Sequence, residues 1–245
     1  MSSRRVYRRD ISGSRLTSFS IAVKETDLWI AVNSFSYNEN LKSGIEQVIW
    51  NRRHQIESYL ETHPHLLTAL EPFLPADDAP EIVKVMARAG NRAGVGPMAA
   101  VAGVIAEEIG QFLLNLSEEV IVENGGDIFI KVSEPVNIGI YAGDSPLSGK
   151  LALQIKPGQT PIGVCTSSGT VGPSISFGRA DAAIALSQST PLADAVATAL
   201  GNRVQGPGEL ETALEFARKI EGITGALLIC GDQIAVWGDI ELQKA

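Results

Sequence analysis

Cysteine and histidine are scarce in this sequence. Its 245 residues include two cysteines, Cys165 and Cys230, and three histidines, the last of which is His65. The cysteines match the spacing of no metal or redox motif and are too few for a disulfide framework. Because no histidine follows His65, Cys165 has no local Cys-His pair, and a small buried thiol is expected there. These absences predict a reduced, cytoplasmic protein.

Basic charge is also in short supply. Twenty lysines and arginines stand against 28 acidic residues, which gives a net charge of −8. A chain of this charge has no overall attraction for nucleic acid or for an anionic membrane. An N-terminal run of arginines is the exception. We expect it to lie on a solvated strand edge, where its positive charge prevents self-association. The alternative is an arm that contacts phosphate groups. The run consists of Arg4, Arg5, Arg8 and Arg9.

Long hydrophobic runs are missing as well. The longest candidate, Pro97–Leu116, is interrupted by Glu107, Glu108 and Gln111, so we expect no membrane-spanning helix. Met1–Asp10 is polar and no apolar segment follows it, so we expect no signal peptide. The hydrophobic content of 44% is nevertheless ordinary for a globular protein with a full core.

The hydrophobic pattern predicts one α+β domain over residues 1–245, with a mainly helical segment at 41–116 between β-rich parts. Period-two runs bounded by turn residues predict strands, and apolar residues at helical spacing predict helices. The predicted strands are 5–11, 18–24, 28–33, 120–123, 128–132, 136–142, 151–155, 163–166, 180–187, 226–230 and 233–237, and the predicted helices are 41–60, 80–90, 97–115, 191–200 and 209–220. Because hairpins join most of the strands, we expect antiparallel sheets with helices packed on them.

The helix predicted at 191–200 carries a pair of side-chain oxygens. Asp194 and Thr198 are one turn apart, so they lie on the same face of this helix. Such a pair suits a hard cation such as Mg²⁺. In the structural alternative, the Asp194 carboxylate interacts favourably with the helix dipole in the first turn, and Thr198 packs in the core. The neighbouring residues are small and apolar and include no lysine or arginine, so a buried carboxylate here needs a partner from elsewhere.

Three glycine-containing segments are candidates for contact with a small phosphate-bearing ligand. The first leads into a helix N-terminus, which is a ready anion site. The second predicts a tight hairpin turn whose glycines let a ligand approach the backbone, and the third is a loop able to cradle phosphates through its amides. Each also has a purely structural interpretation as a connection, a turn or a loop. The segments are Gly94 and Gly96; Asn124, Gly125, Gly126 and Asp127; and Ser167, Ser168, Gly169 and Thr170.

Taken in order, these segments resemble the ApbE superfamily, whose best-known members are FAD:protein FMN transferases, and most closely its shorter ApbE-like branch. The resemblance covers roughly residues 88–202 and is most specific at Ala193–Ala199. It implies a T-fold-like arrangement, Mg²⁺ held by Asp194 and Thr198, and FAD or FMN at Gly125–Asp127. It also implies a homo-oligomer, because T-fold relatives associate through sheet edges.

The sequence departs from the family pattern at one place. The transferases carry a His-Ile-(Ile/Val)-Asp-Pro segment before the Ala-Asp motif, whereas residues 172–181 contain no histidine. An imidazole acting as general base or phosphate contact is therefore missing from that position. Three hypotheses follow. The first is a Mg²⁺-dependent protein that binds a flavin or another phosphate-bearing ligand and transfers FMN from FAD. The second is a non-catalytic binding or assembly module on the same scaffold, and the third is a thiol enzyme that uses Cys165.

Overall fold

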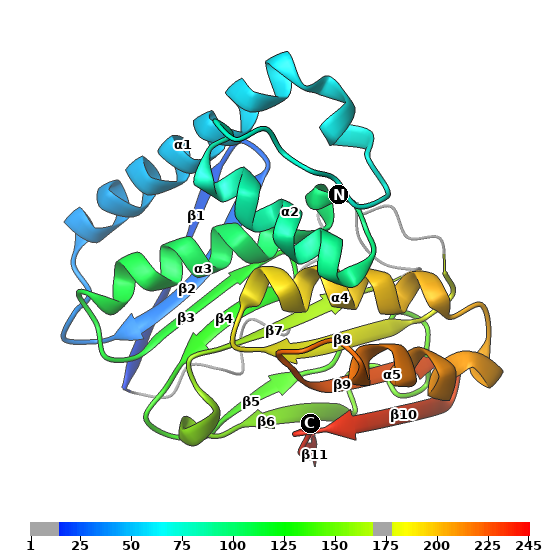
Figure 1. Ribbon diagram of the computed structural model, residues 1–245. Coiled ribbons are helices and arrows are strands. Elements are labelled where there is room, and N and C mark those ends of the chain that lie inside the picture. Colours follow the sequence, from blue (N-terminus) through cyan, green and yellow to red (C-terminus); the bar gives the residue numbers. More distant parts are fainter. Residues whose placement is uncertain (1–14, 169–177) are drawn as a thin grey trace.

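A computed structural model of the chain describes residues 15–168 and 178–245. The predicted strand at 5–11 and the N-terminal arginine run lie outside these residues. An eight-stranded sheet, antiparallel between all neighbours, forms the centre of the fold (Figure 1). Its strands in spatial order are β1 (Leu16–Val23), β2 (Thr26–Asn33), β3 (Val120–Asn124), β4 (Asp127–Lys131), β7 (Ile162–Ser167), β8 (Ala182–Ser187), β9 (Ile223–Cys230) and β10 (Gln233–Gly238).

Helices cover one face of this sheet (Figure 1). The period-two pattern of the strands explains why both faces are apolar: on β2, Leu28 and Ile30 join the helix-side core while Trp29 joins the core of the opposite face. The α-helices are α1 (Glu39–Thr62), α2 (Glu81–Ala93), α3 (Val101–Leu114), α4 (Thr190–Arg203) and α5 (Leu210–Arg218). Short 3₁₀ turns are formed by Pro64–Thr68, Pro97–Ala100, Pro157–Gln159 and Pro207–Glu209.

A second, three-stranded sheet covers the opposite face (Figure 1). It consists of β5 (Val136–Gly139), β6 (Leu151–Ile155) and β11 (Leu242–Lys244) in the order β11-β6-β5. Buried residues of this sheet, such as Leu153 and Ile155, pack against the outer-face residues of the large sheet. The expected α+β architecture of antiparallel sheets with packed helices is confirmed.

Several boundaries differ from the sequence expectation; for example, the helix expected at 80–90 continues to Ala93, and the strand expected at 136–142 ends at Gly139. Gly201-Asn202 was expected to stop α4, but the helix continues to Arg203. Gly178 packs closely on this last turn, because a Cβ on Gly178 would lie 1.8 Å from the Gly201 carbonyl oxygen. The helix expected from Pro97 begins with a 3₁₀ turn and becomes α-helical only at Val101. Strand β11 was not expected, since its three residues gain their structure by pairing with β6.

Within the described residues, Pro97–Leu114 is the one helical stretch whose length and apolar composition would suit a membrane span, and half of it is buried inside the fold. Its burial comes from contact with the sheet. A Cβ on Gly110 would lie 2.1 Å from the ring of Phe129 on β4, so glycine is needed for this approach. The helix therefore lies directly on β3 and β4, the strands that carry the Asn124–Asp127 turn.

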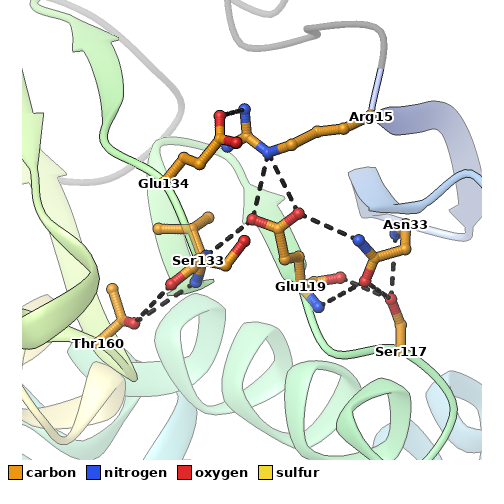
Figure 2. A network of polar contacts seen from close by, with 8 residues as sticks. Arg15, Asn33, Ser117, Glu119, Ser133, Glu134 and Thr160 are labelled. Carbon is orange, nitrogen blue, oxygen red and sulfur yellow. Dashed lines mark hydrogen bonds and ion pairs between the residues drawn. The ribbon is translucent and has the colours of Figure 1, made fainter.

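A buried carboxylate anchors the opposite end of these strands. Glu119 accepts hydrogen bonds from the Arg15 Nε (3.1 Å), the Asn33 Nδ2 (3.0 Å) and the Ser133 backbone amide (2.8 Å), as Figure 2 shows. Burial opposes ionisation, yet the Ser133 and Arg15 contacts hold the pKa of Glu119 below its ordinary value. Glu134 contacts the same arginine from a more exposed position. The network joins β1 and β2 to the residues flanking the β3–β4 hairpin.

We expect Glu119→Ala to lower the free energy of unfolding by about 2 kcal/mol, because it leaves three donors without their acceptor in a largely buried site. The matched control is Glu134→Ala, which removes an exposed ion pair on the same arginine and should cost less than about 0.5 kcal/mol. Urea unfolding at pH 7 measures both. Equal losses in the two variants would show that the buried network adds nothing beyond a surface ion pair.

Candidate functional site

The Asn124–Asp127 segment forms the tight β3–β4 turn that its glycines predict. Gly125 and Gly126 have φ values of +70° and +113°, a region that favours glycine. The Glu123 Oε1 accepts the Gly126 backbone amide at 2.8 Å and fixes the turn. A Cβ on Gly125 would meet no atom within 4 Å, so this side of the turn has open space beside it.

Strand β7 lies beside the turn. Cys165 is the cross-strand partner of Asp127, and the following carbonyl oxygen of Thr166 would lie 3.5 Å from a Cβ on Gly126. Half-buried Ser167 ends β7, and half-buried Ser168 follows it, so the register carries both residues past the glycine turn. The structure thus brings two of the three predicted segments together. Gly169 and Thr170 lie outside the described residues.

Helix α4 brings Asp194 against the first turn of α3. The Gly103 backbone amide donates to the Asp194 Oδ2 at 2.8 Å. A Cβ on Gly103 would lie 2.8 Å from the Asp194 Cβ and 2.7 Å from the Thr190 carbonyl oxygen, so only glycine permits this crossing. The Asn124 Nδ2 donates to the carbonyl oxygen of Ala102 at 3.1 Å. One peptide group of α3 is therefore held by the turn on one side and by Asp194 on the other.

The two helices cap each other. Asp194 on α4 accepts an amide from the first turn of α3, and Glu107 on α3 accepts the Thr190 amide, at the first turn of α4, at 2.6 Å. Burial is the main cause that raises the pKa of Glu107. We did not predict this role for Glu107 from the sequence. The available signal was its position four residues after Gly103, on the same face of an otherwise apolar helix.

The carboxylates of this site lie in a poor environment for negative charge. Burial first, and then the charge of Glu123, raise the pKa of Asp127 to about 7. Burial and the charge of Asp127 raise the pKa of Asp194 well above its ordinary value. No salt bridge to either aspartate occurs within residues 15–168 and 178–245. Two buried acids thus share one region without a basic partner from the described part of the chain.

Cys165 is a fully buried thiol, as expected from the sequence. Its Sγ donates to the Thr190 carbonyl oxygen at 3.4 Å. Burial, followed by the charges of Asp127 and Asp194, raises the pKa of the Cys165 thiol well above its usual range. These causes disfavour the thiolate, which is the reactive form of cysteine, so the geometry does not support the hypothesis of a thiol enzyme.

The remaining candidate residues lie on α4 and at the C-terminal end of α2. Thr198 is half-buried on α4, one turn beyond Asp194 and on the same face. Gly94 is the left-handed cap of α2, with φ +70°. The Gly96 amide donates to the Leu70 carbonyl oxygen at 3.0 Å, and a Cβ there would lie 1.7 Å from the Ala69 carbonyl oxygen. Packing against residues 69–70 therefore accounts for Gly96.

The donor set of this region consists of oxygens. No group of three or more His, Cys, Asp or Glu side chains with metal-binding geometry occurs within the described residues. A structural zinc site uses four protein ligands. Mg²⁺ differs, because it commonly takes one or two carboxylates and keeps water or phosphate oxygens in its other positions. Asp194 and Thr198 fit that pattern. Asp127, at the start of β4, is a further carboxylate of this region.

The α+β fold described above is also the fold of solved ApbE structures. The flavin transferase ApbE from Vibrio cholerae superposes with a TM-score of 0.64 over 91% of this chain and 96% of that one, at 14% identity. The ApbE protein from Thermotoga maritima gives a TM-score of 0.57 over 90% and 96% of the two chains, at 13% identity. At such low identity, the likeness establishes the fold.

Sequence comparison places the chain more narrowly. The chain belongs to the family described as "AbpE bacteria", whose model matches residues 8–241. A UPF0280 protein from Methanocella arvoryzae is 47% identical over 191 residues, covering 78% of each chain. Another from Methanosarcina acetivorans is 42% identical over 220 residues, covering 89% of this chain and 85% of the relative. The expected resemblance to an ApbE-like branch is confirmed.

Proposed function

We propose that this chain binds a flavin nucleotide, FAD or FMN, together with Mg²⁺ held by Asp194 and Thr198. The observation that carries the proposal is Asp194 itself, a carboxylate buried on α4 with an amide donor and no salt-bridge partner within the described residues. A buried charge of this kind is stabilised when a cation is bound. The solved structures of similar fold are of flavin transferases, which supports a flavin as the ligand.

The surrounding residues have matching roles in this proposal. The Gly125–Gly126 turn leaves room for a ring or phosphate to approach the backbone, and the Ser167 and Ser168 hydroxyls are donors beside it. Asp127 orients the ligand from the base of the turn. When bound, Mg²⁺ would neutralise negative charge on the phosphate oxygens. The residues of the chain thus bind and orient the nucleotide, with its phosphates towards α4.

Calorimetric titration with FAD, FMN and ADP, each with and without Mg²⁺, tests this function. We expect Mg²⁺-dependent binding of at least one flavin nucleotide, and we expect Asp194→Asn to weaken it at least tenfold, because the variant removes the charge that attracts the cation. Asp144→Asn removes the same charge from an exposed loop and should bind as the parent protein does. Absence of binding to all three nucleotides would contradict the proposal.

A second candidate function is binding without transfer. It is favoured by the absence of any histidine after His65, since an imidazole is the commonest side chain for general acid–base chemistry. Incubating the protein with FAD, Mg²⁺ and a set of hydroxyl-bearing acceptor peptides separates the two. Transfer of FMN to the acceptor hydroxyl breaks the bond between the two phosphates and releases AMP, which chromatography detects. Flavin binding without AMP release would favour the non-catalytic module.

A further inference from the structure

Asp127 is buried, and its charge acts on Asp194. It stands at the first position of β4, directly opposite Cys165 on β7. The Cys165 Sγ reaches the Thr190 carbonyl oxygen, which belongs to the first turn of α4. Asp194 follows Thr190 by four residues and therefore stands above it on the same helix face. This first path of contacts leads from Asp127 to Asp194 through a single thiol.

A second path joins the same two residues from the other side. Asn124 is the cross-strand partner of Asp127 in the hairpin. The Asn124 Nδ2 donates a hydrogen bond to the Ala102 carbonyl oxygen at 3.1 Å. The next backbone amide along α3, that of Gly103, donates a hydrogen bond to the Asp194 Oδ2 at 2.8 Å. The two aspartates thus belong to one closed ring of contacts that joins β4, β7, α3 and α4. Their positions are set by backbone groups and short side chains.

One oxygen in this ring has no partner within residues 15–168 and 178–245. Asp127 is 7% exposed, and its buried Oδ1 accepts no hydrogen bond from these residues. The Asp127 carboxyl group is hydrogen-bonded to the Cys165 thiol and the Thr166 backbone and is repelled by the charge of Glu123, and none of these groups carries positive charge. Glu123 accepts the Gly126 backbone amide with its Oε1, and an ionised carboxylate has no proton to donate to Asp127. A buried, unpaired carboxylate oxygen is costly unless a cation or a donor reaches it.

We propose that a divalent cation binds between Asp127 and Asp194, with Asp127 as a direct oxygen ligand. The proposal deepens the proposed function, because it rests on the Mg²⁺ site at Asp194 and changes the role of Asp127 from orienting the nucleotide to holding the metal. Two carboxylates suit hard cations such as Mg²⁺ and Mn²⁺, and the remaining positions stay open to water and phosphate oxygens. Glu123, on the far side of the turn, keeps the turn closed.

Titration with Mn²⁺ alone, followed by electron paramagnetic resonance, tests this assignment without any nucleotide. We expect Asp127→Asn and Asp194→Asn each to weaken Mn²⁺ binding at least tenfold, while Asp144→Asn leaves it unchanged. A thermal melt of each variant checks that it is folded. Unchanged Mn²⁺ binding by Asp127→Asn would overturn the inference and leave the proposed function standing. Loss in both variants without flavin binding by the parent protein would support the site and contradict the function.

A crystal of the parent protein soaked in Mn²⁺ provides a test that needs no variant. The anomalous difference map should show a peak between the carboxylates of Asp127 and Asp194. A peak bound by Asp194 and Thr198, with Asp127 outside its coordination shell, would overturn the inference. The same map without any peak would contradict both the inference and the Mg²⁺ part of the proposed function.

Discussion

At pH 8 and without divalent cations, Asp127→Asn is expected to raise the free energy of unfolding by about 4 kcal/mol. The pKa of Asp127 is about 7 in the folded chain against an ordinary value of 3.8. Each pKa unit corresponds to about 1.4 kcal/mol, so the ionised side chain costs roughly this amount when folded. Asparagine has nearly the same shape and carries no charge. Removing the charge also relieves the repulsion that acts on Asp194.

The sign of the pH dependence follows from the same pKa values. Between pH 3.8 and about 7, the folded state holds a proton on Asp127 that the unfolded state has released. The contribution of Asp127 to the free energy of unfolding is therefore fully present below about pH 4 and is lost as the pH rises towards about 7. The gain from Asp127→Asn should be about 4 kcal/mol at pH 8 and only about 1 kcal/mol at pH 4.5.

Urea unfolding in EDTA at both pH values measures this effect. Asp144→Asn, an exposed change of the same charge, should leave the free energy of unfolding within about 0.5 kcal/mol of the parent at either pH. A gain by Asp127→Asn that is the same at pH 4.5 and pH 8 would contradict the assigned charge cost. A loss of stability at pH 8 would show that the carboxylate has a favourable partner.

Stability and cation binding should respond in opposite directions to this substitution. A residue with a merely structural role would not weaken Mn²⁺ binding while stabilising the metal-free fold. Sites that carry function often reduce stability in this way, because a group placed for a ligand is strained or unpaired without it. The opposite responses of one variant would therefore connect the electrostatics of Asp127 with its proposed role.

Local patterns were enough to predict much of the fold. Asn124-Gly125-Gly126 is a local signal, and the structure has the hairpin at that place. The small residues of 193–199 likewise predict a helix packed on all sides, as α4 is. The close approach of Gly178 to the last turn of α4 could not be predicted, because it joins residues that are distant in sequence.

In the candidate site, too, the features encoded by one segment could be predicted, and the contacts between distant segments could not. Asp194 was identified from its spacing to Thr198 and its apolar surroundings, which are visible in one segment. The closeness of Asp127, Cys165 and Asp194 depends on the β4–β7 register and on the crossing of α3 and α4, and no single segment encodes these contacts. The glycine that permits this crossing was visible only as one of several small residues on a helix.

Gly103→Ala is expected to lower the free energy of unfolding by about 3 kcal/mol, although helix propensity alone would favour alanine by about 1 kcal/mol. The added methyl group would lie 2.7 Å from the Thr190 carbonyl oxygen and 2.8 Å from the Asp194 Cβ. Neither atom is the end of a flexible side chain, so α3 and α4 must move apart. That movement would also lengthen the hydrogen bond from the Gly103 amide to Asp194 and weaken Mn²⁺ binding.

The matched control for this prediction is Gly208→Ala, because a Cβ at that position meets no atom within 4 Å. It should change the free energy of unfolding by less than about 1 kcal/mol and leave Mn²⁺ binding as it is. Urea unfolding and Mn²⁺ titration of both variants give the comparison. If Gly103→Ala is as stable as the parent protein, α3 and α4 can separate at no cost. The close crossing would then not be what holds Asp194 at the site.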